Sequence, residues 1–150
     1  MLLQELINSQ QTKQFNDVHI CTKCRKKGTY RYRIFTHVSK YLNVYVRRVL
    51  FKENSLNGVK KQTVVEFDEV LNIAVTIDNG SIIYKTYTLI GLIIHIGKQA
   101  SSGHYVCFTK SGMQWILHDD DNVFLVNREC VFRENTYKNV YLLTYGSDLN

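Results

Sequence analysis

"SSGHYVCFTKSGMQWILHDDDNVFLV", residues 101–126, contains two strand-like segments that are separated by a turn signal. The segments "HYVCFT" and "QWILH" are rich in β-branched and aromatic residues, and a Ser-Gly pair lies between them. This pattern predicts an antiparallel β-hairpin. Pairing the two segments would bring Asp119, just after the second segment, back toward His104 at the start of the first.

Segments of similar composition occur along most of the chain, which predicts a mainly antiparallel β protein. In "YLNVYVRR" (41–48) apolar and polar residues alternate, as in a half-buried strand. Near the N-terminus, apolar residues at helical spacing instead predict a short amphipathic helix over residues 2–9. Strands and helices do not alternate, which excludes a Rossmann-type fold, so the predicted fold class is α+β with a mainly antiparallel sheet. The other strand-like segments are TVVEF, NIAVTI, SIIYKTYTLIGLIIHI, VFLV and VYLLTY (63–67, 72–77, 81–96, 123–126 and 140–145), with turn signals at Asn57-Gly58 and Asn79-Gly80.

The composition is that of one globular domain without a membrane span. The 150 residues are 45% hydrophobic and 21% charged, and a chain of this size buries roughly 68–70% of its unfolded surface. The longest apolar run, 87–96, is interrupted by His95 and falls short of the ~20 residues that a spanning helix needs. Glu5 lies where a signal peptide would have apolar residues, and the cysteines are expected to be reduced thiols. These features favour a location in the cytoplasm or the nucleus.

His104 and Asp119 are the first candidates for chemistry. A carboxylate on one imidazole nitrogen fixes the tautomer and stabilises the charged ring, which leaves the other nitrogen for proton transfer. Asp120 and Asp121 either add hydrogen bonds to such a site or are solvated turn residues. A histidine at the end of a strand is also often structural, so the sequence permits a catalytic dyad without requiring one.

Cys21 and Cys24 form a Cys-x2-Cys pair, which supplies half of a tetrahedral zinc site. No second pair follows, because Cys107 and Cys130 are isolated in the sequence. We therefore expect no cofactor, with zinc at an incomplete Cys21–Cys24 site as the alternative. The segment "KCRKKGTYRYR" (23–33) interleaves basic and aromatic residues in a chain of net charge +6. It suits single-stranded nucleic acid, but a solvated strand edge is the favoured interpretation.

Several motifs, in their order along the chain, resemble the C-terminal half of the catalytic domain of ubiquitin-specific proteases, the papain-like deubiquitinases. "YTLIGLIIHIGKQASSGHYVCF" (87–108) resembles the family's Tyr-x-Leu…His-x-Gly…Ser-Gly-His-Tyr block. "WILHDDDNV" (115–123) resembles its Trp-x-x-Phe-Asp-Asp-x-x-Val block. The fingers helix and second cysteine knuckle, the Leu-x-Lys-Arg-Phe strand, the strand after it and the closing strand resemble "LQELINSQ…FNDVHICTKC", "YRIFTHVSKYLNVYVRRVLF", "VVEFDEVLNI" and "VYLLTY".

The resemblance implies a partial domain with a papain-like cysteine protease fold, in which residues 1–60 form a fingers-like segment and residues 61–150 a palm-like sheet. It also implies that His104 is the catalytic base, that Asp119 orients it, and that Asp120 is the adjacent acidic position. His95 corresponds to a histidine behind the site. A mobile substrate-binding loop near the ubiquitin tail is implied over residues that include Gly97, Ser101, Ser102 and Gly103.

The chain departs from the family pattern at the nucleophile. The family carries its catalytic cysteine in an N-terminal Asn-x-Gly-Asn-Thr-Cys-Tyr segment, and these 150 residues contain nothing similar. Cys107 follows His104 at an odd spacing on one predicted strand, which places the two side chains on opposite faces. Cys130 has no pattern that brings it near His104.

Three functions follow, in order of preference. The first is a ubiquitin-specific-protease-like protein that carries the His/Asp part of the triad but no family-type cysteine, and that is inactive alone. The second is a pseudoenzyme that binds ubiquitin without cleaving it, and the distant third is a basic nucleic-acid-binding protein. The expected partners are ubiquitin or a ubiquitin-like modifier, together with a chain that supplies the missing N-terminal half or a second copy of this chain. No membrane partner is expected.

Overall fold

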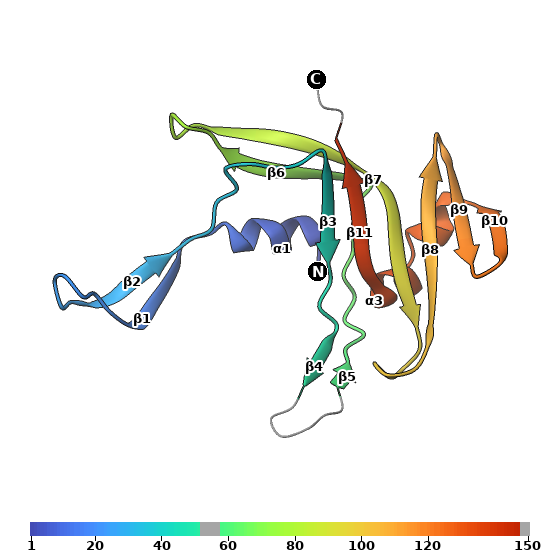
Figure 1. Ribbon diagram of the computed structural model, residues 1–150, viewed down its shortest axis with the longest axis horizontal. Helices are drawn as coiled ribbons and strands as arrows, with labels where there is room; N and C mark the ends of the chain where they lie inside the picture. The colour runs from blue at the N-terminus through green and yellow to red at the C-terminus, as the bar shows by residue number, and fades with distance from the viewer. Residues whose placement is uncertain (52–57, 148–150) are drawn as a thin grey trace.

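The computed structural model describes residues 1–51 and 58–147, and strands dominate it (Figure 1). The described helices are α1 (Leu3–Gln10), α2 (Arg128–Val131) and α3 (Glu134–Asn139). The described strands are β1 (Gln14–Ile20), β2 (Lys27–Arg31), β3 (Tyr41–Tyr45), β4 (Val49–Phe51), β5 (Gly58–Lys60), β6 (Val70–Thr76), β7 (Ile82–Ile96), β8 (His104–Ser111), β9 (Gln114–Asp119), β10 (Asn122–Val126) and β11 (Val140–Gly146). Within these residues, no helix combines the length and the apolar character that crossing a membrane requires.

One antiparallel sheet organises the chain. Its strands follow the order β10-β9-β8-β7-β11-β3, and β6 pairs with the first half of the long strand β7. The hairpins β1–β2 and β4–β5 form two separate small sheets, and β1–β2 lies at the opposite end of the molecule from β9 and β10 (Figure 1). The predicted α+β class with a mainly antiparallel sheet is confirmed.

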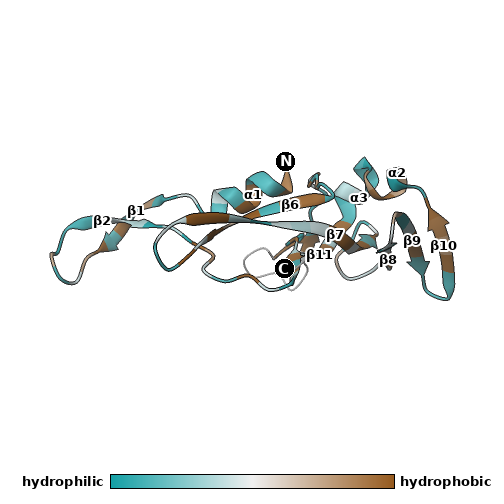
Figure 2. Cartoon of the chain, turned by 90° about the horizontal axis from the view of Figure 1, so that it is seen from above, coloured by the Kyte–Doolittle hydropathy of each residue, from teal (hydrophilic) through white to brown (hydrophobic). Residues whose placement is uncertain are grey.

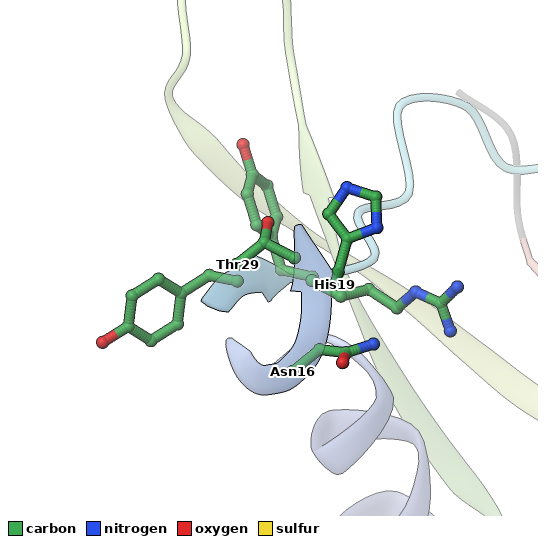
Figure 3. Close-up of a pocket in the computed structure, with 6 residues that line it drawn as sticks. Asn16, His19 and Thr29 are labelled. Carbon is green, nitrogen blue, oxygen red and sulfur yellow. The ribbon is translucent and has the colours of Figure 1, made fainter. Parts of the chain in front are cut away.

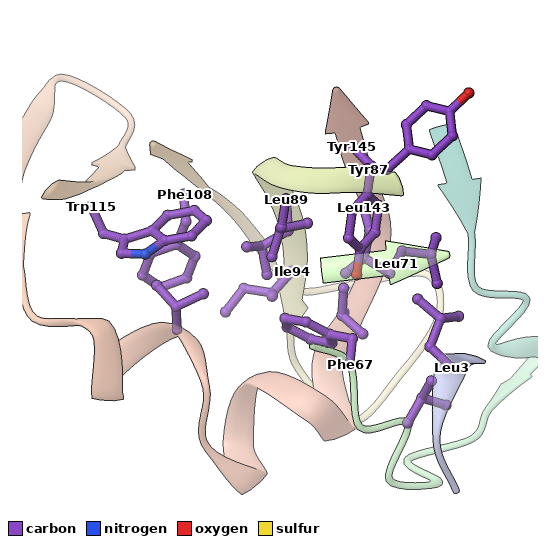
Figure 4. Close-up of a cluster of buried hydrophobic side chains, with 14 of the residues drawn as sticks. Leu3, Phe67, Leu71, Tyr87, Leu89, Ile94, Phe108, Trp115, Leu143 and Tyr145 are labelled. Carbon is purple, nitrogen blue, oxygen red and sulfur yellow. The ribbon is translucent and has the colours of Figure 1, made fainter. Parts of the chain in front are cut away.

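The hydrophobic core lies on one face of this sheet. Leu71, Leu89 and Leu143 project from three different strands and pack with Leu3 of α1 and with Phe67 (Figure 4). A view turned by 90° from Figure 1 shows all three helices on the same side of the strands (Figure 2). Each fully buried Leu or Phe side chain contributes roughly 1.5–3 kcal/mol to folding, so this layer fixes which face of each strand points inward.

Arg48 is a charged residue inside this packed structure, with only 2% of its surface exposed. Its guanidinium donates hydrogen bonds to the carbonyl oxygens of Val140 (2.6 Å), Tyr137 (2.5 Å), Thr63 (2.7 Å) and Lys61 (3.3 Å). Burial lowers the pKa of Arg48, and the four acceptors replace the water that burial removes. Arg48 therefore links residues 61–63 to α3 and to the start of β11.

Substitution Arg48→Met should lower the free energy of unfolding by about 3 kcal/mol, because four carbonyl groups lose a hydrogen bond from the guanidinium. Urea denaturation followed by circular dichroism would measure the change. Arg47→Met is the matched control, since Arg47 is exposed, and it should stay within about 0.5 kcal/mol of the wild type. Equal stabilities of the two variants would contradict the proposed structural role of Arg48.

Several local predictions are confirmed. The helix expected over residues 2–9 is α1, and the Asn79-Gly80 signal lies in the turn between β6 and β7. In β3 the side chains of Leu42 and Val44 are half-buried while their neighbours are exposed, as the alternation predicts. Of the Asn57-Gly58 signal, Asn57 lies outside the described residues and Gly58 begins β5.

The strand predicted over residues 63–67 is wrong. This segment forms only an isolated bridge, between Glu66 and Leu2, and no ladder. The N–H of Val65 instead donates to the carbonyl of Tyr137, outside any strand. Val65 and Phe67 are buried against the sheet, so the apolar composition that resembled a strand reflects burial of an irregular segment. The two shortest helices, α2 and α3, had no periodicity long enough to predict them.

Candidate functional site

The β8–β9 hairpin brings His104 and Asp119 together. The register pairs Phe108 with Leu117, so the open end of the hairpin places Asp119 diagonally opposite His104 on the same face. His104 Nε2 lies 2.5 Å from Asp119 Oδ1, a short charge-assisted hydrogen bond. Because this bond occupies Nε2, the Nδ1 atom of the imidazole remains for proton transfer.

Asp120 lies beside this pair at the start of the turn between β9 and β10. Its φ of +50° is in the left-handed region, which aspartate tolerates better than most residues. One ligand atom each from His104, Asp119 and Asp120 lie within 4.8 Å of one another. The structure thus brings together the three residues that the sequence predicts, and no cysteine in the described part of the chain joins them.

The pairing with Asp119 raises the pKa of His104. The hydrogen bond to Asp119 raises the pKa of His104 above its ordinary value of 6.5. Desolvation opposes this shift, and the charges of Asp119 and Asp120 add smaller increases. Since the folded-state pKa is the higher one, the pair stabilises the fold fully below the unfolded pKa. This stabilisation is lost as the pH rises through the folded pKa.

Substitution Asp119→Asn should therefore lower the pKa of His104, as measured by NMR titration of its ring protons. The wild type should also be more stable than Asp119→Asn below the ordinary histidine pKa, and the difference should shrink as the pH rises through the folded-state pKa of His104. Asp78→Asn, in the distant turn between β6 and β7, is the control and should leave the His104 titration unchanged. A His104 pKa that is the same in wild type and Asp119→Asn would refute the pairing.

Residues 97–103 connect β7 to β8 in a loop whose two ends, at Gly97 and Gly103, lie close together. A Cβ atom at Gly97 would lie 2.9 Å from the carbonyl oxygen of Ser102. At Gly103 (φ +157°) a Cβ would lie 2.5 Å from the carbonyl oxygen of Ile96 and would collide with the His95 ring. Glycine is therefore required where the two sides of the loop meet. All four predicted loop residues (Gly97, Ser101, Ser102 and Gly103) lie in this segment, immediately before His104.

On the opposite face of the sheet from the core, aromatic rings surround His95. Its ring centroid lies 4.6 Å from that of Tyr105 and 5.5 Å from that of Tyr141. Burial and the nearby Lys60 lower the pKa of His95, which keeps it neutral behind the site. An apolar hollow opens beside this cluster, lined by Tyr45, Val49, Ile93, Ala100, Tyr105, Tyr141 and Leu142. This surface could not be predicted from the sequence, because alternation shows which side chains share a face but not which strands are neighbours.

Cys107 and Cys130 lie on different elements of the described structure. Cys107 alternates with the core residues Val106 and Phe108 on β8, so it faces the other side of the sheet from His104. Burial also raises the pKa of Cys107, which disfavours the thiolate. Cys130 lies in the short helix α2, whose Val131 packs into the core. The expectation that Cys107 faces away from His104 is confirmed.

Cys21 and Cys24 lie in the turn of the β1–β2 hairpin, far along the molecule from His104 (Figure 1). Backbone N–H groups of Cys24 and Lys23 lower the pKa of Cys21. In the part of the chain that the structure describes, no third metal-binding side chain joins the two thiols. The two thiols supply two of the four ligands that a closed zinc site needs.

The same hairpin carries a shallow hollow on its surface (Figure 3). The ring of Tyr30 packs against Phe15, with centroids 5.2 Å apart, and Lys13 lies over it. Of the basic and aromatic segment 23–33, Tyr30 thus makes its contacts within the hairpin region itself. The hollow is lined by Asn16, His19, Thr29, Tyr30, Arg31 and Tyr32.

Comparison with known proteins gives one consistent result. A family model described as "Ubiquitin carboxyl-terminal hydrolase" matches residues 4–145. The chain is 28% identical over 128 residues to ubiquitin carboxyl-terminal hydrolase 23 of Arabidopsis thaliana, and 28% identical over 93 residues to ubiquitin carboxyl-terminal hydrolase 9 of Saccharomyces cerevisiae. Among solved structures, the SAGA Ubp8/Sgf11/Sus1/Sgf73 DUB module bound to ubiquitin aldehyde is similar with a TM-score of 0.78 and 26% identity.

The similarity covers most of this chain but a small part of each relative. The matches include 83% of the chain and 14% of the plant relative, and 61% of the chain and 12% of the yeast relative. The structural match includes 98% of this chain and 33% of the solved chain. The chain therefore corresponds to about a third of the structurally matched protein.

Proposed function

The chain belongs to the ubiquitin carboxyl-terminal hydrolase family, and from this we propose that it supplies the histidine and its orienting carboxylates to a thiol-dependent deubiquitinase. The observation that carries the proposal is the 2.5 Å contact between His104 Nε2 and Asp119 Oδ1, with Asp120 beside it. A histidine held in this way has one fixed nitrogen and one free nitrogen, which is the arrangement of a general base.

In the proposed reaction, His104 Nδ1 accepts the proton of a cysteine thiol, and the resulting thiolate attacks the carbonyl carbon at the C-terminus of ubiquitin. The new C–S bond forms a tetrahedral intermediate, and the C–N bond of the isopeptide then breaks as His104 returns the proton to the leaving lysine amine. Water, deprotonated by His104, hydrolyses the thioester and releases ubiquitin. Asp119 stabilises the charged imidazole during both steps.

We further propose that the nucleophile comes from a cysteine outside these 150 residues, because Cys107 and Cys130 do not join the His104 group. The attacking thiol then belongs to a segment or a partner chain that packs beside the β7–β8 loop. The exposed apolar hollow next to Tyr105 and Tyr141 lies behind that loop and offers a surface for the ubiquitin tail or for the complementary half. The chain alone would bind ubiquitin without hydrolysing the isopeptide bond. A location in the cytoplasm or nucleus follows from this role.

Intact-mass analysis with a ubiquitin probe that carries a C-terminal thiol trap tests the proposal. We expect no adduct on the isolated chain, and an adduct on the added cysteine when the N-terminal, cysteine-bearing half of a related catalytic domain is supplied. An adduct on the isolated chain that disappears in Cys107→Ser or Cys130→Ser would overturn the proposed origin of the nucleophile. Ubiquitin binding that survives His104→Ala, with no adduct under any condition, would instead identify a non-catalytic ubiquitin-binding protein.

A further inference from the structure

Lys60 is the last residue of β5, and its side chain is buried. Only 7% of its surface is exposed. Its Nζ donates hydrogen bonds to the carbonyl oxygens of His95 (2.6 Å) and Gly97 (2.7 Å) and to Asn139 Oδ1 (3.0 Å). The three donors of the ammonium thus have three acceptors, from β7, from the loop after it and from α3.

The position of these acceptors explains why a donor is needed there. Strand β11 begins at Val140, which pairs with Ile94, so its ladder with β7 ends before His95. The carbonyl groups of His95 and Gly97 both lie beyond the last residue of β7 that pairs with β11, and both accept from Lys60 Nζ. In the described residues, the Lys60 ammonium takes the place of the missing strand and satisfies both carbonyls.

The two carbonyls flank the residue that sets the position of His104. Ile96 is the register partner of His104 and the last pair in the β7–β8 ladder. On one side of it, His95 supports the backbone of Gly103; on the other, Gly97 begins the loop. Fixing His95 and Gly97 therefore fixes both ends of the loop that leads into His104.

An ion pair does not explain this lysine. The described residues place no carboxylate within ion-pair distance of Lys60 Nζ, and its other close neighbour is the Tyr141 ring, 5.8 Å away. A buried cation without a counter-ion is costly, and burial together with Arg48 lowers the pKa of Lys60. The contacts of Lys60 instead assign it to main-chain carbonyl groups, to which its ammonium group donates hydrogen bonds.

We propose that Lys60 is a positioning residue, whose ammonium group clamps the end of β7 to the base of the 97–103 loop and so holds His104 against Asp119. This role rests on the proposed function of His104, but the clamp itself is tested without ubiquitin. It predicts that loss of the ammonium loosens the loop and the His104–Asp119 pair while the core stays folded.

The first measurement compares Lys60→Met with Lys61→Met, the adjacent exposed lysine, in the isolated chain by NMR. In Lys60→Met, amide hydrogen exchange over 97–104 should accelerate roughly tenfold or more, as expected for the loss of about one net hydrogen bond. The pKa of His104 should fall toward its ordinary value, because Asp119 is paired with it less of the time. Simple removal of a positive charge would instead raise that pKa, so an increase, or no change in either quantity, would overturn the proposal.

A second measurement on the wild type avoids the risk that Lys60→Met does not fold. The Lys60 ammonium should give a slowly exchanging 15Nζ signal with scalar couplings across the hydrogen bonds to the carbonyl carbons of His95 and Gly97. Absence of these couplings would overturn the clamp, and their presence supports it. Neither measurement depends on hydrolysis, so a failure of ubiquitin probes would count against the proposed function and leave the clamp standing.

Discussion

Replacing Gly103 by alanine should lower the free energy of unfolding by roughly 3 kcal/mol and separate His104 from Asp119. The new Cβ would lie 2.5 Å from the carbonyl oxygen of Ile96 and would also collide with the His95 ring. A backbone oxygen cannot move without breaking the Ile96–His104 pair of the ladder, and His95 is held between Tyr105 and Tyr141. The strain therefore falls on the segment that positions His104.

Gly112→Ala is the matched control for this substitution. Gly112 lies at the other end of β8, also has positive φ (+59°), and has no atom within 4 Å of an added Cβ. Only the left-handed backbone is penalised there, by about 1–2 kcal/mol. Chemical denaturation gives both stabilities, and NMR titration of His104 reports the pair. If Gly103→Ala proved no more destabilising than Gly112→Ala, and the His104 titration were unchanged, the close packing of the two ends of the 97–103 loop would be refuted.

The hairpin that carries the site could be predicted because its determinants are local. Two alternating segments and a Ser-Gly turn fix the register, and the register alone brings Asp119 diagonally opposite His104. The alternation also assigns Cys107 to the other face. Chemistry that lies on neighbouring paired strands is therefore accessible from the sequence.

Lys60 and Arg48 could not be predicted, because their partners are distant in the chain. The acceptors of Lys60 are separated from it by 35, 37 and 79 positions. Neither residue differs in local pattern from an exposed lysine or arginine on a strand edge. Their roles arise only where the β11 ladder ends and where α3 meets the sheet, which tertiary packing decides. The wrong strand at 63–67 has the same origin, since burial and strand formation select similar residues.

The largest effect on activity is expected at the His–Asp pair, once a cysteine-bearing half has been supplied. His104→Ala should lower kcat for cleavage of a ubiquitin C-terminal amide by about 10³-fold, within the range for loss of a general acid–base group. Asp119→Asn should lower kcat by at least about 10²-fold, because the tautomer and the charge of His104 are no longer fixed. KM should change little in both variants, since neither side chain lies in the apolar hollow.

Asp121→Asn separates a specific effect of the pair from a general loss of negative charge at this turn. Asp121 is exposed and follows Asp120 in the same turn, but it is not a member of the three-residue group around His104. Its substitution should leave kcat within about twofold of the wild type, as expected for a solvated surface residue. A comparable loss in Asp121→Asn, or full activity in His104→Ala, would show that the 2.5 Å contact is structural. A large loss confined to His104 and Asp119 would mean that this chain contributes the proton-transfer half of the reaction, because the two residues form one hydrogen-bonded unit that acts on a thiol brought from elsewhere.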